Sequence, residues 1–162
     1  MPRVRRAVAL VATAAGTVLL AACGGPVDVD VPKLSKTDAK VCSSFADALP
    51  EALAEQTRDE IDPSDAPAAA YGDPAIVVRC GVPEPKGFDL TASCERANGV
   101  GYYIPDEQYV DQEADVTITT AGYEPRVEIV VPADYRPGGV ADAMAALAPL
   151  VKEHLTLVEP CE

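Results

Sequence analysis

His154 is the only histidine in the 162-residue chain, and it is the first candidate for catalysis. Acyl transfer needs a nucleophile activated by a neighbouring base. Ser43 and Ser44 are the hydroxyl groups that could lie beside His154 if the helices that carry these residues pack together. No Gly-x-Ser-x-Gly motif is present, and a histidine near a helix C-terminus is favoured there as a surface cation. We therefore expect no catalytic residues, no enzymatic activity and no cofactor.

The acidic run at residues 111–115 is a second candidate, because Asp111, Glu113 and Asp115 alternate like the first ligands of a calcium-binding loop. A complete EF-hand loop also needs glycine at its sixth position and glutamate at its twelfth. These positions hold Val116 and Gly122. The sequence therefore predicts a solvated acidic loop here and no metal site.

Arg79 lies inside the apolar stretch "AIVVRCGV" (75–82), which is typical of a strand. Alternation along the strand places Arg79 on the face opposite Cys80. We expect its guanidinium to form a salt bridge with Asp73 or another carboxylate. The alternative is a ligand contact, because a guanidinium can hold the carboxylate or phosphate of a bound molecule.

Cys23 ends the only long apolar run, residues 7–22, which follows three arginines in the order typical of a secretory signal peptide. As a helix the run spans about 24 Å at roughly 1.5 Å per residue, which is short of the ~30 Å of a hydrocarbon core. The tetrapeptide "LAAC" (20–23) resembles the bacterial lipobox, in which the cysteine thiol receives a diacylglycerol and cleavage leaves it at the new N-terminus. We expect a lipoprotein anchored stably by acyl chains such as palmitate on Cys23. The alternative is an ordinary cleaved signal peptide.

Removal of residues 1–22 leaves 10 of the 13 basic residues and all 26 acidic ones, a net charge of −16. This charge excludes nucleic acid as a partner, because phosphate contacts need cationic side chains. Residues 23–36 then form the lipidated N-terminus and a short tether containing Pro and Gly, and residues 37–162 form one domain. We expect this domain on the outer face of the cell membrane, held there by its lipid.

The other four cysteines are Cys42, Cys80, Cys94 and Cys161. An even number in an exported domain predicts two disulfides. No Cys-x-x-Cys pair occurs, and the chain has a single histidine, so a zinc site or a thioredoxin-like site is not expected.

Periodicity predicts an α+β fold in which an N-terminal and a C-terminal helix pack on one face of an antiparallel sheet. Thr37 or Asp38 is expected to cap the first helix, and Pro50 to interrupt or restart it, with Leu53 continuing its apolar face.

Tyr102 and Tyr103 point to opposite faces of a strand, so one is expected in the core and the other exposed. The predicted elements are a helix from Thr37, a loop at 59–74 with at most a short edge strand, strands at 75–82 and 100–104, a hairpin of 115–120 and 126–131, and a helix from Gly138 that Pro149 should kink.

This layout favours one of the three possible disulfide connectivities. Cys42 and Cys80 both point toward the contact between the first helix and the sheet, so they meet when that helix docks. Cys161, just after the final helix, then pairs with Cys94. The chain-entropy model assigns each bridge about 4 kcal/mol of stability.

Three segments together resemble an actinobacterial lipoprotein family known as domain of unknown function 3515. They are "YGDPAIVVRCGVPEP" (71–85), "NGVGYY" (98–103) and "PRVEIVVPADY" (125–135). The resemblance covers roughly residues 37–161. It implies a place in the cell envelope and supplies no activity.

Three function classes follow from these observations. A non-catalytic binding or interaction module, working on an envelope protein or a cell-wall partner, needs no catalytic group and is the leading interpretation. A small cell-wall hydrolase or transferase needs converging carboxylates or an activated nucleophile. A lipoprotein that binds a cationic ligand or cation is consistent with the charge of the mature chain. A deep pocket lined by carboxylates favours the last two classes, and a flat patch with an exposed tyrosine favours the first.

Overall fold

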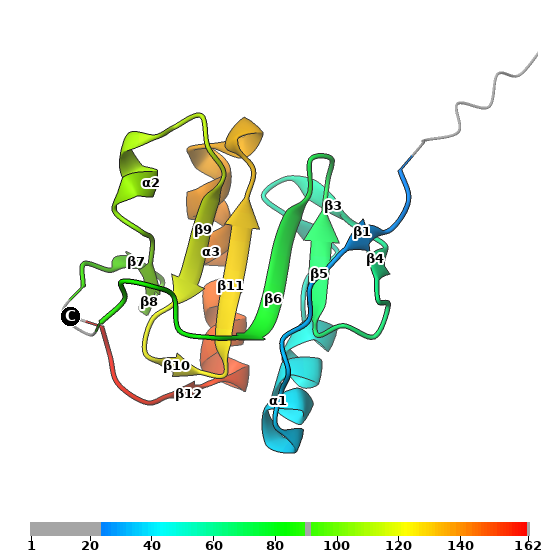
Figure 1. Cartoon of the computed structure of the whole chain (residues 1–162), viewed down its shortest axis with the longest axis horizontal. Helices are drawn as coiled ribbons and strands as arrows, with labels where there is room; N and C mark the ends of the chain where they lie inside the picture. Colours follow the sequence, from blue (N-terminus) through cyan, green and yellow to red (C-terminus); the bar gives the residue numbers. More distant parts are fainter. Residues whose placement is uncertain (1–23, 90–91, 162) are drawn as a thin grey trace, which may run out of the picture.

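The computed structural model describes residues 24–89 and 92–161, so Cys23 and the predicted signal peptide lie outside the described residues (Figure 1). Its centre is an eight-stranded antiparallel sheet in the order β2-β3-β5-β6-β11-β9-β8-β7. The strands of this sheet are β2 (Ala52–Leu53), β3 (Gln56–Asp59), β5 (Ala68–Tyr71), β6 (Ile76–Val82), β7 (Glu95–Ala97), β8 (Val100–Tyr103), β9 (Val116–Thr120) and β11 (Arg126–Val131).

Two short ribbons and four helical segments complete the fold. One ribbon pairs β1 (Val27–Asp28) with β4 (Ile61–Asp62), and the other pairs β10 (Tyr123–Glu124) with β12 (Thr156–Leu157). The helical segments are α1 (Lys36–Asp47), α2 (Glu107–Val110), the 3₁₀ turn η1 (Ala133–Tyr135) and α3 (Gly138–His154). In the described part of the chain, no helix combines the length and the apolar character that crossing a bilayer requires.

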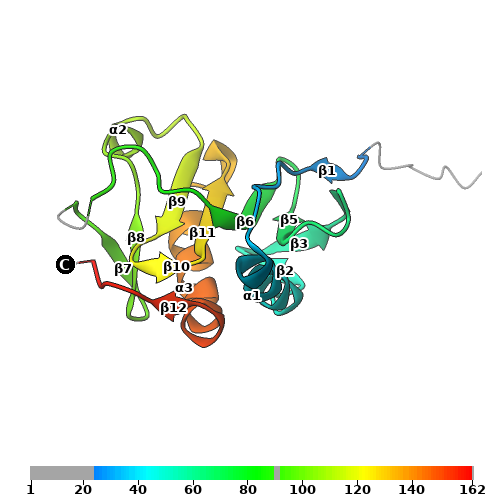
Figure 2. The same ribbon diagram turned by 60° about the horizontal axis from the view of Figure 1, so that its bottom comes forward.

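The two longest helices, α1 and α3, both pack on the same face of the sheet (Figure 2). Strands β6 and β11 supply the centre of that face, because their buried residues alternate with partly exposed ones. Ile129 of β11 lies opposite Val78 of β6 on one side and Ile118 of β9 on the other, and all three are fully buried. The predicted α+β fold is therefore confirmed.

Helix α1 begins earlier and ends sooner than its sequence pattern predicts. Its N-cap is Ser35, whose Oγ accepts a hydrogen bond from the backbone N–H of Asp38 at 3.1 Å, so neither Thr37 nor Asp38 is the cap. The helix ends at Asp47, before Pro50, and does not restart. Leu53 lies in β2 and still enters the core with 1 % of its surface exposed.

Both predicted disulfides are present. Cys42 of α1 is bonded to Cys80 of β6, with their Cα atoms 5.3 Å apart. Cys94, just before β7, is bonded to Cys161, with Cα atoms 6.4 Å apart. The first bridge fixes α1 to the sheet, and the second fixes the C-terminal segment to the β7 end.

The predicted loop at 59–74 contains the end of β3 and the short strand β4 near its start, where the sequence allowed a short strand, but it also contains β5, which was not predicted. Strand β5 reads Ala68-Ala69-Ala70-Tyr71, and all four residues are buried. Alanine lacks the β-branched or aromatic side chain that marks a strand in sequence. Pairing with β6 along its whole length decides its conformation.

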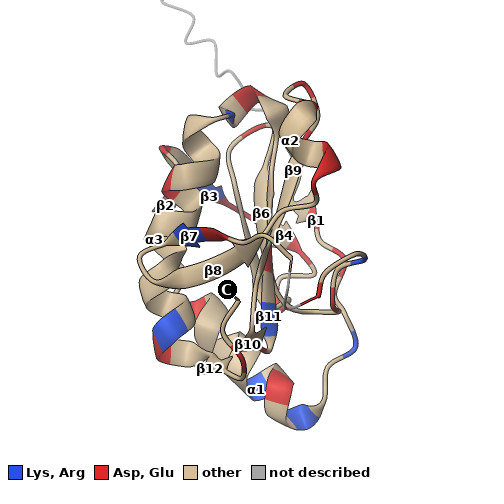
Figure 3. Ribbon diagram, turned by 90° about the vertical axis from the view of Figure 1, so that its left-hand side faces the viewer, with Lys and Arg blue, Asp and Glu red and all other residues tan. Residues whose placement is uncertain are grey.

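Part of the predicted tether belongs to the folded domain, which therefore begins before residue 37. Strand β1 pairs in parallel with β4, on the side of the sheet opposite α3 (Figure 3). Val29 is only 3 % exposed. Leu34 packs against Gly81, a residue with φ of +86° at which an added Cβ would lie 2.2 Å from Leu34 Cδ2. Backbone pairing and apolar burial hold this segment to the domain, although its Pro and Gly content predicted a free tether.

Candidate functional site

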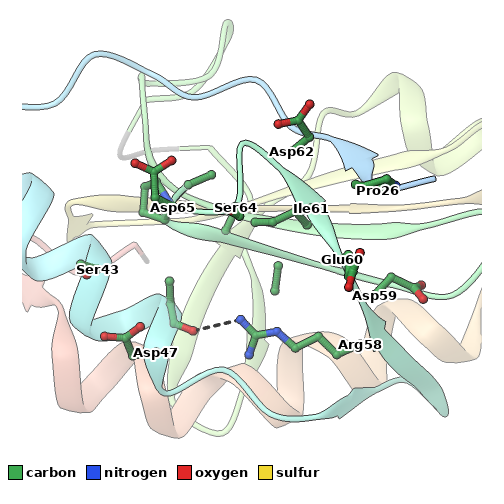
Figure 4. Close-up of a pocket in the computed structure, with 15 residues that line it drawn as sticks. Pro26, Ser43, Asp47, Arg58, Asp59, Glu60, Ile61, Asp62, Ser64 and Asp65 are labelled. Atoms are coloured by element: carbon green, nitrogen blue, oxygen red, sulfur yellow. Dashed lines mark hydrogen bonds between the residues drawn. The ribbon is translucent and has the colours of Figure 1, made fainter.

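A cavity of about 870 Å³ lies between α1, β4 and β5 (Figure 4). Five acidic residues contribute to its lining, together with Arg58 and several small side chains. The acidic residues are Asp47, Asp59, Glu60, Asp62 and Asp65.

The cavity exists because the chain leaves the sheet after Asp59. Strand β3 pairs with β5 only through Arg58 opposite Tyr71 and Asp59 opposite Ala70. The following residues turn away, and β4 pairs with β1 instead. The first half of β5, Ala68 and Ala69, is left without a neighbouring strand on that side, and its methyl groups fill little space. The result is a hollow at the edge of the sheet.

Arg58 forms no ion pair with the described cavity carboxylates. Its Nη1 donates to the carbonyl oxygen of Leu49 at 3.1 Å, and its Nη2 donates to that of Ala46 at 3.5 Å. These carbonyls lie at and just beyond the C-terminus of α1, where a cation is favourable because the last carbonyls lack partners within the helix. Figure 4 shows the side chain lying along the floor of the cavity, directed at the end of the helix.

None of the five carboxylates takes part in an ion pair with another described residue. The described ranges also contain no group of three or more His, Cys, Asp or Glu side chains placed to hold a metal ion. The carboxylates are therefore spread around the cavity and do not converge on one point. This distribution suits a cationic ligand with separated positive groups better than a single metal ion.

Arg79 pairs with Glu128, its cross-strand partner in β11, and not with Asp73. Its Nε donates to Glu128 Oε1 at 3.1 Å, and its Nη2 forms a second hydrogen bond to the same oxygen. Its Nη1 donates to the carbonyl oxygen of Asp30 at 3.4 Å. The guanidinium is thus occupied by structural contacts, as the salt-bridge interpretation expected.

The acidic run at 111–115 is organised by Arg136. Its Nη1 donates to the carbonyl oxygens of Asp111 and Ala114 at 2.8 and 2.7 Å, and its Nη2 donates to that of Gln108 at 2.8 Å. Asp115 Oδ1 accepts from the backbone N–H of Ala133. The guanidinium of Arg136 thus holds three backbone carbonyl oxygens of residues 108–114.

His154 does meet one of the two serines named from the sequence. Ser44 Oγ and His154 Nδ1 are 3.3 Å apart, and the imidazole also packs edge-on against Phe45. No carboxylate of the described residues is hydrogen-bonded to His154. Ser44 lies inside α1, where backbone N–H groups bond within the helix and cannot stabilise an oxyanion. Ser43, by contrast, lines the acidic cavity.

Tyr102 and Tyr103 are both buried, which corrects the expectation that one is exposed. Tyr102 donates to the carbonyl oxygen of Met144 at 2.9 Å. Tyr103 is covered by Phe88, whose ring centroid lies 5.3 Å away, because the loop after β6 folds over the second face of the sheet. Burial raises the pKa of both phenols.

Sequence reasoning missed the cavity itself. Its carboxylates lie at the end of the predicted first helix and in the predicted acidic loop. The cluster of Asp and Glu at residues 59–65 was the one sequence signal for an acidic cavity. What the sequence did not indicate is that β5 leaves room beside them.

Residues 5–159 match a family described as "Protein of unknown function (DUF3515)". No curated protein and no solved structure matches the chain.

Proposed function

Because the chain belongs to the DUF3515 family, whose description states no activity, we propose a function from the residues themselves: a lipid-anchored, extracytoplasmic binding module that holds a cationic ligand in its acidic cavity. The proposed location is the outer face of the cell membrane. The observation that carries the binding role is a cavity of about 870 Å³ lined by five carboxylates and by one arginine whose Nη1 and Nη2 each donate to a backbone carbonyl oxygen.

The anchor is supported by the sequence around Cys23. The apolar run, the "LAAC" tetrapeptide and the two glycines that follow have the order of a lipoprotein signal. The two disulfides fit an oxidising compartment, because such bonds persist outside the cytoplasm.

The choice of a cation follows from electrostatics. Carboxylates around a concave surface raise the local concentration of positive ligands, and their effect adds across the cavity. A ligand with several ammonium groups can approach several carboxylates at once. Spermidine and a short lysine peptide are suitable probes of this chemistry.

The test is calorimetric titration of the domain, residues 24–162, with spermidine at low salt. We expect saturable binding that weakens as NaCl is added, since salt screens exposed charges. The double substitution Asp47→Asn with Asp65→Asn removes two cavity charges and is expected to weaken binding by ~10-fold, or about 1.4 kcal/mol.

The matched control is Asp134→Asn with Asp142→Asn, which removes the same charge from η1 and α3, outside the cavity. This variant should bind spermidine nearly as well as the unmodified domain. Equal weakening in both variants would show that spermidine responds only to net charge, and the cavity would lose its assigned role.

A further inference from the structure

On the basis of the lipid anchor proposed above, we infer that the surface formed by β1, β4 and the adjoining cavities faces the membrane, so that the acidic cavity meets its ligand at the level of the lipid headgroups. The partner of this surface is the bilayer itself. The inference concerns which side of the domain is held there and how closely.

The reach of the anchor is set by the first paired residue. The backbone N–H of Val27 donates to the carbonyl oxygen of Glu60 at 2.8 Å, and that of Val29 donates to the carbonyl oxygen of Asp62 at 2.9 Å. Three residues, 24–26, therefore separate Cys23 from the first paired residue, which is four Cα-to-Cα steps away. A fully extended chain covers at most ~3.6 Å per residue, so the domain starts within about 14 Å of the lipidated cysteine.

The segment that follows is held at several further points. Val29 is buried, Asp30 accepts a hydrogen bond from Arg79 Nη1 at 3.4 Å, and Leu34 contacts Gly81. A free tether extending to residue 36 would instead reach ~47 Å from Cys23 at the same extension. The pairing of β1 with β4 thus shortens the connection by about two thirds.

The cavities lie at this end of the molecule. Pro26 lines the large cavity, and Gly24, Gly25 and Val27 line a second one of about 600 Å³. Asp59 and Glu60 line both cavities. Strand β7 and the C-terminal end of the described chain lie at the other end of the sheet (Figure 1). Six strand spacings separate β3 from β7, which is ~29 Å at about 4.8 Å each.

The acidic character of this end affects how closely it approaches lipid. Anionic headgroups repel the carboxylates over a screening length of ~8 Å at physiological salt. In anionic membranes at low salt the domain should sit at the full length of its connection, and in neutral membranes it should sit closer.

Single-tryptophan variants test the inference, because the chain contains no tryptophan. Ser64→Trp places the probe beside the cavity, and Ser93→Trp places it just before β7. Both serines are exposed. The chain 23–162 is attached through the Cys23 thiol to a maleimide lipid in phosphatidylcholine vesicles that contain a dansyl lipid, and energy transfer from tryptophan is measured. Asp65→Trp, also exposed, replaces Ser64→Trp if that variant does not fold.

We expect transfer from residue 64 to exceed transfer from residue 93 at least twofold. Insertion of about twelve Gly and Ser residues after Gly25 should remove most of this difference, because a flexible connection then replaces the short one. Equal transfer from both positions, or a difference that survives the insertion, would overturn the inference. Since the lipid is attached chemically, this outcome is separate from whether cells acylate Cys23 and from whether spermidine binds.

Discussion

Ser44 and His154, 110 residues apart in the chain, face each other across the contact between α1 and α3, with 3.3 Å between Ser44 Oγ and His154 Nδ1. A serine hydroxyl and a histidine imidazole are the groups of a nucleophile and its base. However, no carboxylate of the described residues is hydrogen-bonded to His154 to orient its ring. The hydrogen bond joins the second half of the first helix to the last residue of the final helix.

Substitution of Ser44 by alanine should therefore reduce stability and leave no catalytic signature. We expect a loss of ~1 kcal/mol in the free energy of unfolding, which is typical of one hydrogen bond, measured by urea denaturation. Ser43→Ala, next to it on the same helix, should change stability by less than ~0.5 kcal/mol. Labelling of Ser44 by a fluorophosphonate that depended on His154 would instead identify an active nucleophile.

Arg136 should be the main stabiliser of the loop around 108–114, because it donates to three carbonyl oxygens there. We expect Arg136→Gln to lower the free energy of unfolding by ~2–3 kcal/mol, because hydrogen bonds from charged donors are stronger than those from neutral donors. Amide hydrogen exchange should accelerate in this loop more than in β6.

Addition of calcium tests whether the same loop is a metal site. With Arg136 in place, millimolar calcium should not raise the melting temperature of the domain. Stabilisation by calcium that disappeared in Asp111→Asn would show that the acidic run is a metal site after all.

Tyr71 should make stability depend on pH in the alkaline range. Burial raises the pKa of its phenol from 10.0 to about 12, although the nearby positive charge of Arg58 opposes the shift. The neutral phenol is favoured by the fold, so this contribution is complete below pH 10 and is lost as the pH rises from 10 to 12. Its size is on the order of 2 kcal/mol.

Urea denaturation between pH 8 and pH 12 measures this effect, with Tyr71→Phe as the comparison. The variant loses the hydrogen bond to the carbonyl oxygen of Pro50, 3.0 Å long, and should be ~1 kcal/mol less stable at pH 8. Its stability should then fall less steeply above pH 10. Identical slopes in the two proteins would assign the alkaline transition to other tyrosines such as Tyr109, whose pKa is also raised to about 12.

The parts of the fold that could be predicted are those with local signals. Alternation in β6 and β11 identified the strands and placed Cys80 toward α1, which was enough to choose the disulfide partner of Cys42. The face pattern of α3 identified the final helix in the same way.

The parts that could not be predicted depend on contacts between distant segments. Three alanines form β5 because β6 pairs with them, and Tyr103 is buried because Phe88 comes back over the sheet. The cavity requires both the exit of the chain after Asp59 and the pairing of β4 with β1. Neither event has a signature within its own segment.

The two disulfides enclose consecutive stretches of the chain, since the loop closed by Cys42 and Cys80 ends before Cys94 begins the next. Under the export proposed above, with the N-terminus leading, Cys42 and Cys80 would meet an oxidant before Cys94 leaves the export channel. With Cys23 lipidated as proposed, Cys80 would then be the first free thiol that Cys42 meets. Cys94 and Cys161 remain as the final pair. Under the proposed export, the order of arrival would favour the native bridges without a later exchange of partners.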